Sequence, residues 1–419
     1  MIKKPLDKIF QNIESSTDEQ IQFLGDIIKT PAVAPSSGGI GEWDKVELIE
    51  ERARAMGFTD IERYDAVDPT SPSGARPNLV VWLRGRRKDG IEDNDIPRLI
   101  VLTHTDVVPP GDLNAWNTDP FSAVVDEVRI FGRGAEDNGQ SLTAALFAAK
   151  AVRDCGIDPI IDVGLVMVAD EEIGNEKGII HLMNQGFFNK NDLILVPDHG
   201  EPDGRLVDVS EKSVAWIKVT TKGKQCHSSR PDKGINAFRA AMKFGTMVDE
   251  ALHDSFARKD KLFDYQFSSF EPTKKDANVQ NVNTIPGEDV FFIDCRVLPE
   301  YQLDDVMTEM RGIADIVEKD TGTKISFDPV LKVEAAAPTP LDVPIVKMLL
   351  SAIDNVYKND PYPGGIGGST VAATLRRAGY HAAVWETVEN TAHSPNEYAV
   401  IENMVNDCKV FATLFIDGI

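Results

Sequence analysis

The chain has 419 residues, 42% hydrophobic and 26% charged, which is typical of a globular protein with two or three domains. Its 67 acidic and 44 basic residues produce a formal net charge of -23, and such a surface repels phosphate backbones and anionic lipid. We therefore expect neither nucleic acid nor membrane partners.

Four scattered cysteines without a C-x-x-C pair exclude a disulfide framework and a zinc finger. The amino-terminal stretch lacks the apolar core of a signal peptide, and no run approaches the ~20 apolar residues that span a bilayer. These features predict a cytoplasmic protein.

The first half of the chain alternates helical and strand patterns. Residues 18–29 and 42–56 carry apolar residues at helical spacing. Continuous apolar runs, which predict strands covered on both faces, lie at Asn78–Leu83, Leu99–Leu102, Val163–Val168 and Leu193–Val196. Helical patterns separate them at Ser141–Val152 and Lys177–Asn184. This alternation predicts an α/β domain with a mostly parallel sheet and flanking helices.

The pattern changes near Ser210. The elements expected from there are a strand at Ser213–Thr220, a helix at Asn236–Leu252, strands at Asn278–Thr284 and Val290–Leu298, a helix at Leu303–Lys319 and a strand at Lys324–Pro329. This β-α-β-β-α-β order is the ferredoxin-like unit. Residues 334–344 resemble a linker. We therefore predict a discontinuous α/β domain of residues 1–210 and 335–419, interrupted by a ferredoxin-like domain of residues 211–334.

Potential metal ligands follow the apolar runs, at the strand ends where open α/β sheets bind ligands. They are His104 and Asp106 after Leu99–Leu102, Glu171 and Glu172 after Val163–Val168, Asp198 after Leu193–Val196, and His393 beyond Ala382–Trp385. Asp137 lies in a glycine-rich turn, Phe131–Asp137 (FGRGAED). The four strand ends are expected to meet at one edge of the sheet.

Each of these residues also has a purely structural explanation. Asp106 could close an Asx-turn, Asp137 could cap a helix, and Glu171 with Glu172 could favour a helix dipole. Asp106 and Glu171 are not counted as ligands here. The remaining two histidines, His104 and His393, and three carboxylates, Asp137, Glu172 and Asp198, include no thiolate and favour Zn²⁺, Co²⁺ or Mn²⁺. Five ligands exceed the three of one catalytic zinc, so two metals about 3.5–4 Å apart fit better.

Five motifs carry a resemblance to a known family: HTDVVP at 104–109, WxxDPF at 116–121, GRGAED at 132–137, DEEIG at 170–174 and AHSPNE at 392–397. They resemble the metallopeptidase family of aminoacylase, succinyl-diaminopimelate desuccinylase, acetylornithine deacetylase, carboxypeptidase G and carnosine dipeptidase. The resemblance implies a zinc exopeptidase-type fold with a lid domain, and two-metal hydrolysis of linear amides. It implies these roles: His104 and Asp198 on one metal, Glu172 and His393 on the other, Asp137 bridging both, Asp106 orienting His104, and Glu171 as general base.

The inserted domain resembles the family's lid, and the resemblance implies a homodimer through it. His227 would polarise the scissile carbonyl, in many members from the partner subunit. Asn283 and Arg296 resemble lid residues that hold a substrate carboxylate. The loop Gly364–Thr370, with Gly368, Ser369 and Thr370, resembles the family's glycine-rich substrate loop.

Three departures from the family pattern leave the substrate open. Asp198 stands where desuccinylases and carboxypeptidase G have Glu, and aminoacylases and dipeptidases more often have Asp. Val371 replaces a frequent Asp, and Asn138-Gly139-Gln140 replaces Asp-Lys-Gly.

The first hypothesis is a deacylase of N-acyl amino acids, desuccinylase-like activity included. The second is a metallo-dipeptidase or exopeptidase of the same family. A non-catalytic binding protein is the third, although such a protein is expected to have lost a ligand or the base, and none is missing.

Overall fold

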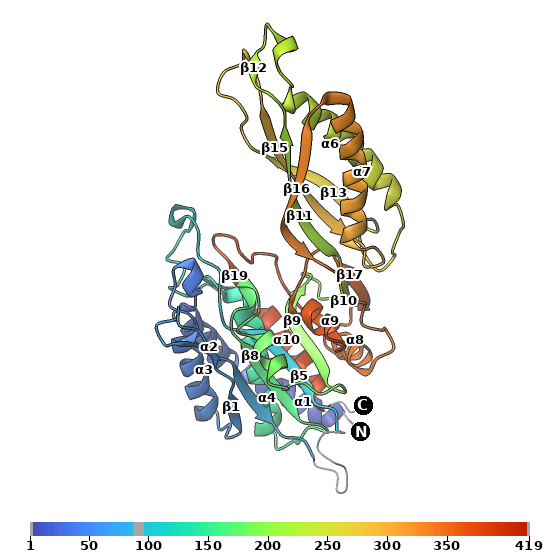
Figure 1. Ribbon diagram of the computed structural model, residues 1–419. Coiled ribbons are helices and arrows are strands. Elements are labelled where there is room, and N and C mark those ends of the chain that lie inside the picture. The colour runs from blue at the N-terminus through green and yellow to red at the C-terminus, as the bar shows by residue number, and fades with distance from the viewer. Residues whose placement is uncertain (1–2, 87–95, 417–419) are drawn as a thin grey trace. The chain divides into compact units, whose positions relative to one another are not determined.

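Two compact units make up the computed structural model, which describes residues 3–86 and 96–416 (Figure 1). The first unit comprises Met1–Val209, Thr339–Pro363 and Thr370–Ile419. The second comprises Ser210–Pro338 and Gly364–Ser369. The chain therefore leaves the first unit twice and returns to it.

The segment Gly364–Ser369 corrects the predicted domain of residues 335–419, because it belongs to the second unit. Backbone hydrogen bonds explain the difference: Gly365 N donates to Leu262 O at 2.7 Å, and Lys212 N donates to Ile366 O at 3.1 Å. These are backbone hydrogen bonds, and the glycine-rich sequence of the segment does not indicate which residues it pairs with.

An eight-stranded sheet is the largest in the structure. Its strands in spatial order are β1 (Ile61–Arg63), β4 (Leu79–Leu83), β8 (Val163–Val168), β5 (Leu99–His104), β9 (Leu193–Gly200), β18 (Ala382–Glu386), β10 (Leu206–Glu211) and β17 (Tyr362–Ile366). β8, β5, β9 and β18 are parallel to one another, whereas β1, β4 and β10 pair antiparallel. The predicted α/β class is confirmed, and so are the strands expected from the apolar runs.

Helices cover both faces of this sheet. They are α1 (Lys3–Ser15), α2 (Thr17–Ile28), α3 (Trp43–Ala55), α4 (Ser141–Asp154), α5 (Ile179–Asn184), α8 (Pro344–Tyr357), α9 (Val371–Arg377) and α10 (Ile401–Ile416). α4 packs against α10 and α1, and its alanine-rich sequence is a strong helix former whose small side chains allow close packing. Side chains alternate across the strands, so Val80, Ile100, Val166 and Ile194 face α5 and α9 on one side.

The second unit is a four-stranded antiparallel sheet with two helices (Figure 1). Its elements are β11 (Ser213–Lys222), α6 (Ala237–Ser255), β13 (Ser269–Lys275), β15 (Glu288–Val297), α7 (Leu303–Thr321) and β16 (Lys324–Val333). The strand order β13-β15-β11-β16 is that of the ferredoxin-like unit. α6 and α7 bury their apolar faces on the sheet around Phe244 and Val306.

One predicted strand in this unit is wrong. Asn278–Thr284 is mostly irregular, with a fully exposed Val282, and the second strand of the unit is instead Ser269–Lys275. That segment is an exposed edge strand in which only Phe270 is buried. Its sequence, SFEPTKK, therefore lacks the apolar alternation by which strands are recognised.

Three small sheets complete the fold. They are β12 (Cys226–His227) with β14 (Thr284–Ile285), β19 (Tyr398–Val400) with β7 (Arg129–Phe131) and β6 (Val124–Val125), and β2 (Ala66–Val67) with β3 (Ala75–Arg76). Among the described residues, no helix has the length and apolarity needed to cross a membrane.

Candidate metal centre

The carboxyl ends of four adjacent parallel strands carry most of the predicted site residues. His104 is the last residue of β5, and Asp198 lies near the end of β9. Glu171 and Glu172 form a short 3-10 turn after β8, and the loop with His393 follows β18. Because these strands are neighbours, the side chains gather at one edge of the sheet.

His104, Asp137 and Asp198 form a first candidate cation site. His104 Nε2 lies 2.7 Å from Asp137 Oδ1 and 3.3 Å from Asp198 Oδ1. One potential ligand atom of each residue lies within 4.8 Å of the others. Three such ligands with one position left open are the set that a catalytic zinc ion uses.

Asp137, Glu172 and His393 form a second candidate cation site. His393 Nε2 lies 3.0 Å from Glu172 Oε2 and 3.1 Å from Asp137 Oδ2. Asp137 thus directs Oδ1 toward His104 and Oδ2 toward His393. A carboxylate with one oxygen in each group is suited to bridge two cations. The combined nitrogen and oxygen set, without thiolate, fits Zn²⁺, Co²⁺ or Mn²⁺.

The pKa values reflect an excess of negative charge in these groups. Burial lowers the pKa of His104, but Asp137 and Asp106 outweigh it and raise that pKa well above its usual range. Hydrogen bonds to Asp137 and Glu172 raise the pKa of His393 to about 10. Burial and then the charge of Asp137 raise the pKa of Glu172 to about 7. Divalent cations would neutralise this charge in place of the protons on the two histidines.

Asp106 joins the ends of β5 and β8. Its Oδ1 accepts a hydrogen bond from Glu171 N and its Oδ2 one from Glu172 N, both at 3.1 Å. His104 Nδ1 lies 3.0 Å from the backbone oxygen of Asp106 and 3.5 Å from its Oδ1. Asp106 therefore lies beside His104 and also positions the two glutamates.

The adjacent carboxylates of Glu171 and Glu172 have different surroundings. Glu172 contacts His393, whereas no residue in 3–86 or 96–416 donates a hydrogen bond to the Glu171 carboxylate. Burial and then the charge of Asp198 raise the pKa of Glu171 well above its usual range. A carboxylate that accepts no hydrogen bond from the protein is available to exchange a proton with a water molecule, which suits a general base.

A buried ion-pair cluster lies behind this turn and was not predicted from the sequence. Arg76 donates through Nε to Glu42 Oε2 at 2.5 Å and through Nη1 to Asp170 Oδ1 at 3.3 Å. Asp170 adopts a left-handed conformation with φ 66°, which Asp tolerates better than most residues. Lys177 N donates to Asp170 Oδ2 at 2.9 Å. The cluster thus holds the residue that precedes Glu171.

The predicted site residues of the second unit fall into two places. His227, on β12, is exposed, and its Nε2 lies 3.5 Å from Asn283 Nδ2. Its Nδ1 lies 2.8 Å from Ser229 Oγ. His227 and Asn283 therefore form one polar pair where β12 meets β14.

Arg296, on β15, contacts the glycine-rich loop. Its Nη1 donates to Gly367 O at 2.9 Å, next to Gly368 and Ser369. Its Nε and Nη2 donate to the two oxygens of Asp294 at 2.7 Å and 3.1 Å. Thr370 differs from its neighbours in the loop, because it belongs to the first unit and its Oγ1 accepts from Ala372 N at the start of α9.

Two of the three departures from the family pattern occupy structural positions, whereas the third, Asp198, lies in the first candidate cation site. Val371 is 3% exposed and packs in the core beside α5. Asn138 Nδ2 donates to Pro197 O at 2.5 Å, which ties the Asp137 turn to the end of β9. A Cβ on Gly139 would lie 2.3 Å from the backbone oxygen of Gly134, so only glycine fits there.

Comparisons with known proteins agree with this fold. Residues 100–417 match the model of peptidase family M20/M25/M40. An uncharacterized metallohydrolase of Methanococcus maripaludis is 36% identical over 420 residues, covering 95% of this chain and 99% of the relative. A succinyl-diaminopimelate desuccinylase of Alkalilimnicola ehrlichii is 26% identical over 388 residues, covering 91% and 94%. The solved structure of the di-peptidase Dug1p from Saccharomyces cerevisiae has a TM-score of 0.71 at 18% identity, covering 98% of each chain.

The fold and the site define a metal-dependent hydrolase. More particularly, the chain belongs to peptidase family M20/M25/M40. The resemblance expected from the motifs is confirmed. The hypothesis of a non-catalytic binding protein is not supported, because the relatives are metallohydrolases, peptidases and desuccinylases.

Proposed function

We propose that this hydrolase cleaves the amide bond of N-acyl amino acids at a two-metal centre. The observation that carries the proposal is the shared carboxylate of Asp137, which lies in both candidate cation sites. His104 and Asp198 complete one site, and Glu172 and His393 complete the other. Zn²⁺ is the proposed metal, with Co²⁺ and Mn²⁺ as alternatives that the same ligands accept.

Glu171 is the proposed general base. Bound metal ions supply Lewis acidity, which brings the pKa of water to about 7 and stabilises negative charge on oxygen. Glu171 accepts the proton of the water that attacks the carbonyl carbon, and passes it to the amine nitrogen as the C–N bond breaks. The products are a carboxylate and a free amino acid.

Substrate binding is assigned to the second unit. His227 would donate a hydrogen bond to the scissile carbonyl, and Asn283 is its neighbour. Arg296 would bind the substrate carboxylate beside Gly368 and Ser369. Thr370, in the first unit, is also proposed to bind substrate, and its hydroxyl accepts the hydrogen bond from Ala372 N at the start of α9.

A dipeptidase is the second candidate, and Asp294 favours it. Asp294 accepts hydrogen bonds from two of the three Arg296 nitrogens and balances the charge of the guanidinium. The pair therefore offers a substrate a carboxylate as well as a guanidinium. A carboxylate at this position would bind the free α-amine that dipeptides carry and N-acyl amino acids lack. Asp198, which is more usual in dipeptidases and aminoacylases than in desuccinylases, agrees with either candidate.

A substrate panel tests the choice. The apoprotein loaded with Zn²⁺, Co²⁺ or Mn²⁺ is expected to hydrolyse N-acetyl- and N-succinyl-amino acids with a kcat/KM at least about 10-fold above that for dipeptides, a difference of about 1.4 kcal/mol. Release of the free amino acid is measured by a ninhydrin-type assay. Activity confined to dipeptides would contradict the deacylase proposal and support the dipeptidase.

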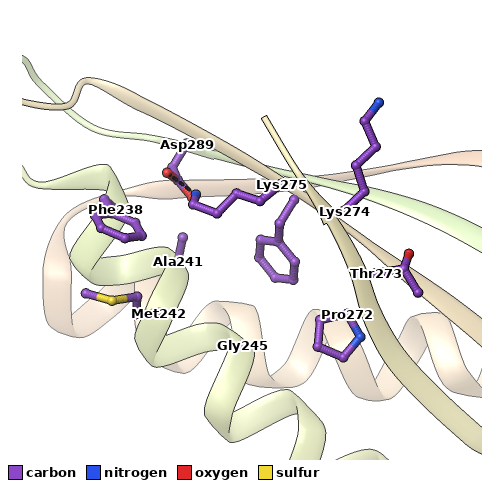
Figure 2. A pocket seen from close by; sticks show the side chains of 10 residues that line it. Phe238, Ala241, Met242, Gly245, Pro272, Thr273, Lys274, Lys275 and Asp289 are labelled. Atoms are coloured by element: carbon purple, nitrogen blue, oxygen red, sulfur yellow. Dashed lines mark hydrogen bonds and ion pairs between the residues drawn. The ribbon is translucent and has the colours of Figure 1, made fainter. Parts of the chain in front are cut away.

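A homodimer through the second unit is also proposed. A groove of about 310 Å³ lies between α6 and the edge strand β13 (Figure 2). Apolar residues such as Phe238, Ala241 and the exposed Met242 line it. Its lining also includes the charged Lys274, Lys275 and Asp289. β13 carries Pro272 and two lysines, which discourage pairing of its edge with another strand. In a two-fold dimer, Met242 of each copy could enter the groove of the other.

The mass in solution tests this interface. Light scattering is expected to show about twice 46.1 kDa for the wild type and about 46.1 kDa for Met242→Glu, because burying a carboxylate against Phe238 and Ala241 costs free energy. Val330→Glu, an exposed position on the opposite edge strand β16, is the control and should keep the dimer. A wild-type mass of 46.1 kDa would contradict the dimer.

The cytoplasm is the proposed compartment, since all four cysteines are unpaired.

A further inference from the structure

Two buried glutamates outside the ligand set connect the loops that carry Asp137 and His393. Glu136 precedes Asp137, and Glu397 follows His393 by four residues. Glu136 is 2% exposed and Glu397 is 0% exposed. Both belong to motifs noted in the sequence, but no role was assigned to either. A carboxylate buried this deeply needs donors for its oxygens.

Glu397 takes its donors from the Asp137 loop. Its Oε1 accepts from the backbone N–H groups of Glu136 and Asp137, both at 3.0 Å. Its Oε2 accepts from Gly134 N at 3.1 Å and from Arg133 Nη1 at 2.6 Å. One carboxylate thus fixes the backbone on which the shared ligand Asp137 sits.

Glu136 takes its donors from the His393 loop. Its Oε1 accepts from Glu389 N at 2.5 Å. Its Oε2 accepts from Thr391 N at 2.5 Å, from Thr391 Oγ1 at 2.9 Å and from Ala392 N at 2.9 Å. These contacts end at the residue before His393. Each ligand loop therefore supplies a carboxylate that holds the other loop.

We infer that Glu136 and Glu397 are positioning residues of the metal centre with unequal effects on its two sites. Glu136 holds only the loop of His393, which belongs to one cation site. Glu397 holds the backbone of Asp137, which belongs to both sites. Loss of the Glu136 contacts should therefore weaken one metal, and loss of the Glu397 contacts should weaken two. This inference rests on the proposed two-metal centre.

Isosteric variants test the asymmetry. In Glu136→Gln, the amide NH₂ must face backbone N–H groups, so contacts to the His393 loop are lost while the side-chain volume is kept. Apoprotein is titrated with Zn²⁺ by calorimetry and with Co²⁺ by its visible absorption. For Glu136→Gln we expect one equivalent with wild-type affinity and a second weakened by about 10- to 100-fold. For Glu397→Gln we expect both equivalents to be weakened by a similar factor.

Controls separate positioning from folding. Glu127→Gln, an exposed glutamate in the neighbouring β6–β7 turn, should bind both ions as the wild type does. Thr391→Val removes one donor to Glu136 and should weaken the same single ion by less than Glu136→Gln does. Circular dichroism of each apoprotein checks the fold. If a glutamate variant does not fold, metal titration of Thr391→Val tests the inference instead.

The outcomes distinguish the two proposals. A wild type that binds two ions, with a Glu136→Gln variant that loses neither or weakens both equally, overturns the inferred asymmetry and leaves the two-metal function intact. A wild type that binds fewer than two ions overturns the two-metal centre and the inference with it.

Discussion

Glu171→Gln is expected to lower kcat by about 10²–10⁴-fold on the best substrate of the panel, while the variant still binds metal. Glutamine keeps the size of the side chain but cannot accept the proton of the attacking water. Glu171 contributes no atom to either candidate cation site, so metal stoichiometry should not change. The measurement is kcat alongside the metal content of the same preparation.

Glu176→Gln is the matched control, because Glu176 is an exposed glutamate in the same loop. It is expected to keep wild-type kcat. A Glu171→Gln variant with near wild-type turnover would show that another group moves the proton. A variant that loses metal would instead place Glu171 among the metal ligands. The structure argues against that result, because Glu172 and not Glu171 contacts His393.

Asp137→Asn is expected to abolish measurable activity and to lose at least one of the two metals. Asparagine offers one oxygen, so it cannot direct an oxygen into each cation site. Binding of ions to the folded state alone stabilises the wild type, by about 2.7 kcal/mol for one site at 100 times its Kd. The metal-dependent rise in melting temperature should therefore be much smaller in the variant. Thermal unfolding with and without Zn²⁺, before and after treatment with a chelator, measures it.

Asp158→Asn serves as the control for this change, because Asp158 is exposed and precedes β8, whereas Glu171 and Glu172 follow the opposite end of that strand. It should gain as much stability from Zn²⁺ as the wild type. If Asp137→Asn retained two ions and the full metal-dependent stabilisation, Asp137 would not be the shared ligand. In that case the two sites would be separate, and the proposed mechanism would fail.

Buried strands were predictable because each of them is a continuous run of apolar residues in the sequence. β5, β8, β9 and β18 lie where runs such as Leu99–Leu102 placed them. The antiparallel direction of β4 was not predictable, since a run buried on both faces has the same composition in either direction. β13 was missed because an exposed edge strand needs no apolar face. α1 was not among the predicted helices.

The candidate ligands could be proposed from their chemistry and position in the chain. His104, Asp198 and Glu172 follow apolar runs, and parallel strands bring such residues to one edge. The shared position of Asp137 came from resemblance, and the structure adds that its two oxygens lie toward different histidines. No local pattern indicated that Arg76 would hold Asp170, because the two are 94 residues apart.

The sequence by itself determined the α/β class, the inserted ferredoxin-like unit and the family, since each depends on local patterns of apolar residues or on short motifs. Only the tertiary structure decided which carboxylates hold the ligand loops and which one accepts no hydrogen bond. Glu136, Glu171 and Glu397 are the same residue type, and their surroundings alone distinguish them. Glu136 and Glu397 accept hydrogen bonds from loops more than 250 residues away, whereas the carboxylate of Glu171 accepts none within the described part of the chain. Burial and available donors, which arise only when distant segments meet, set these differences.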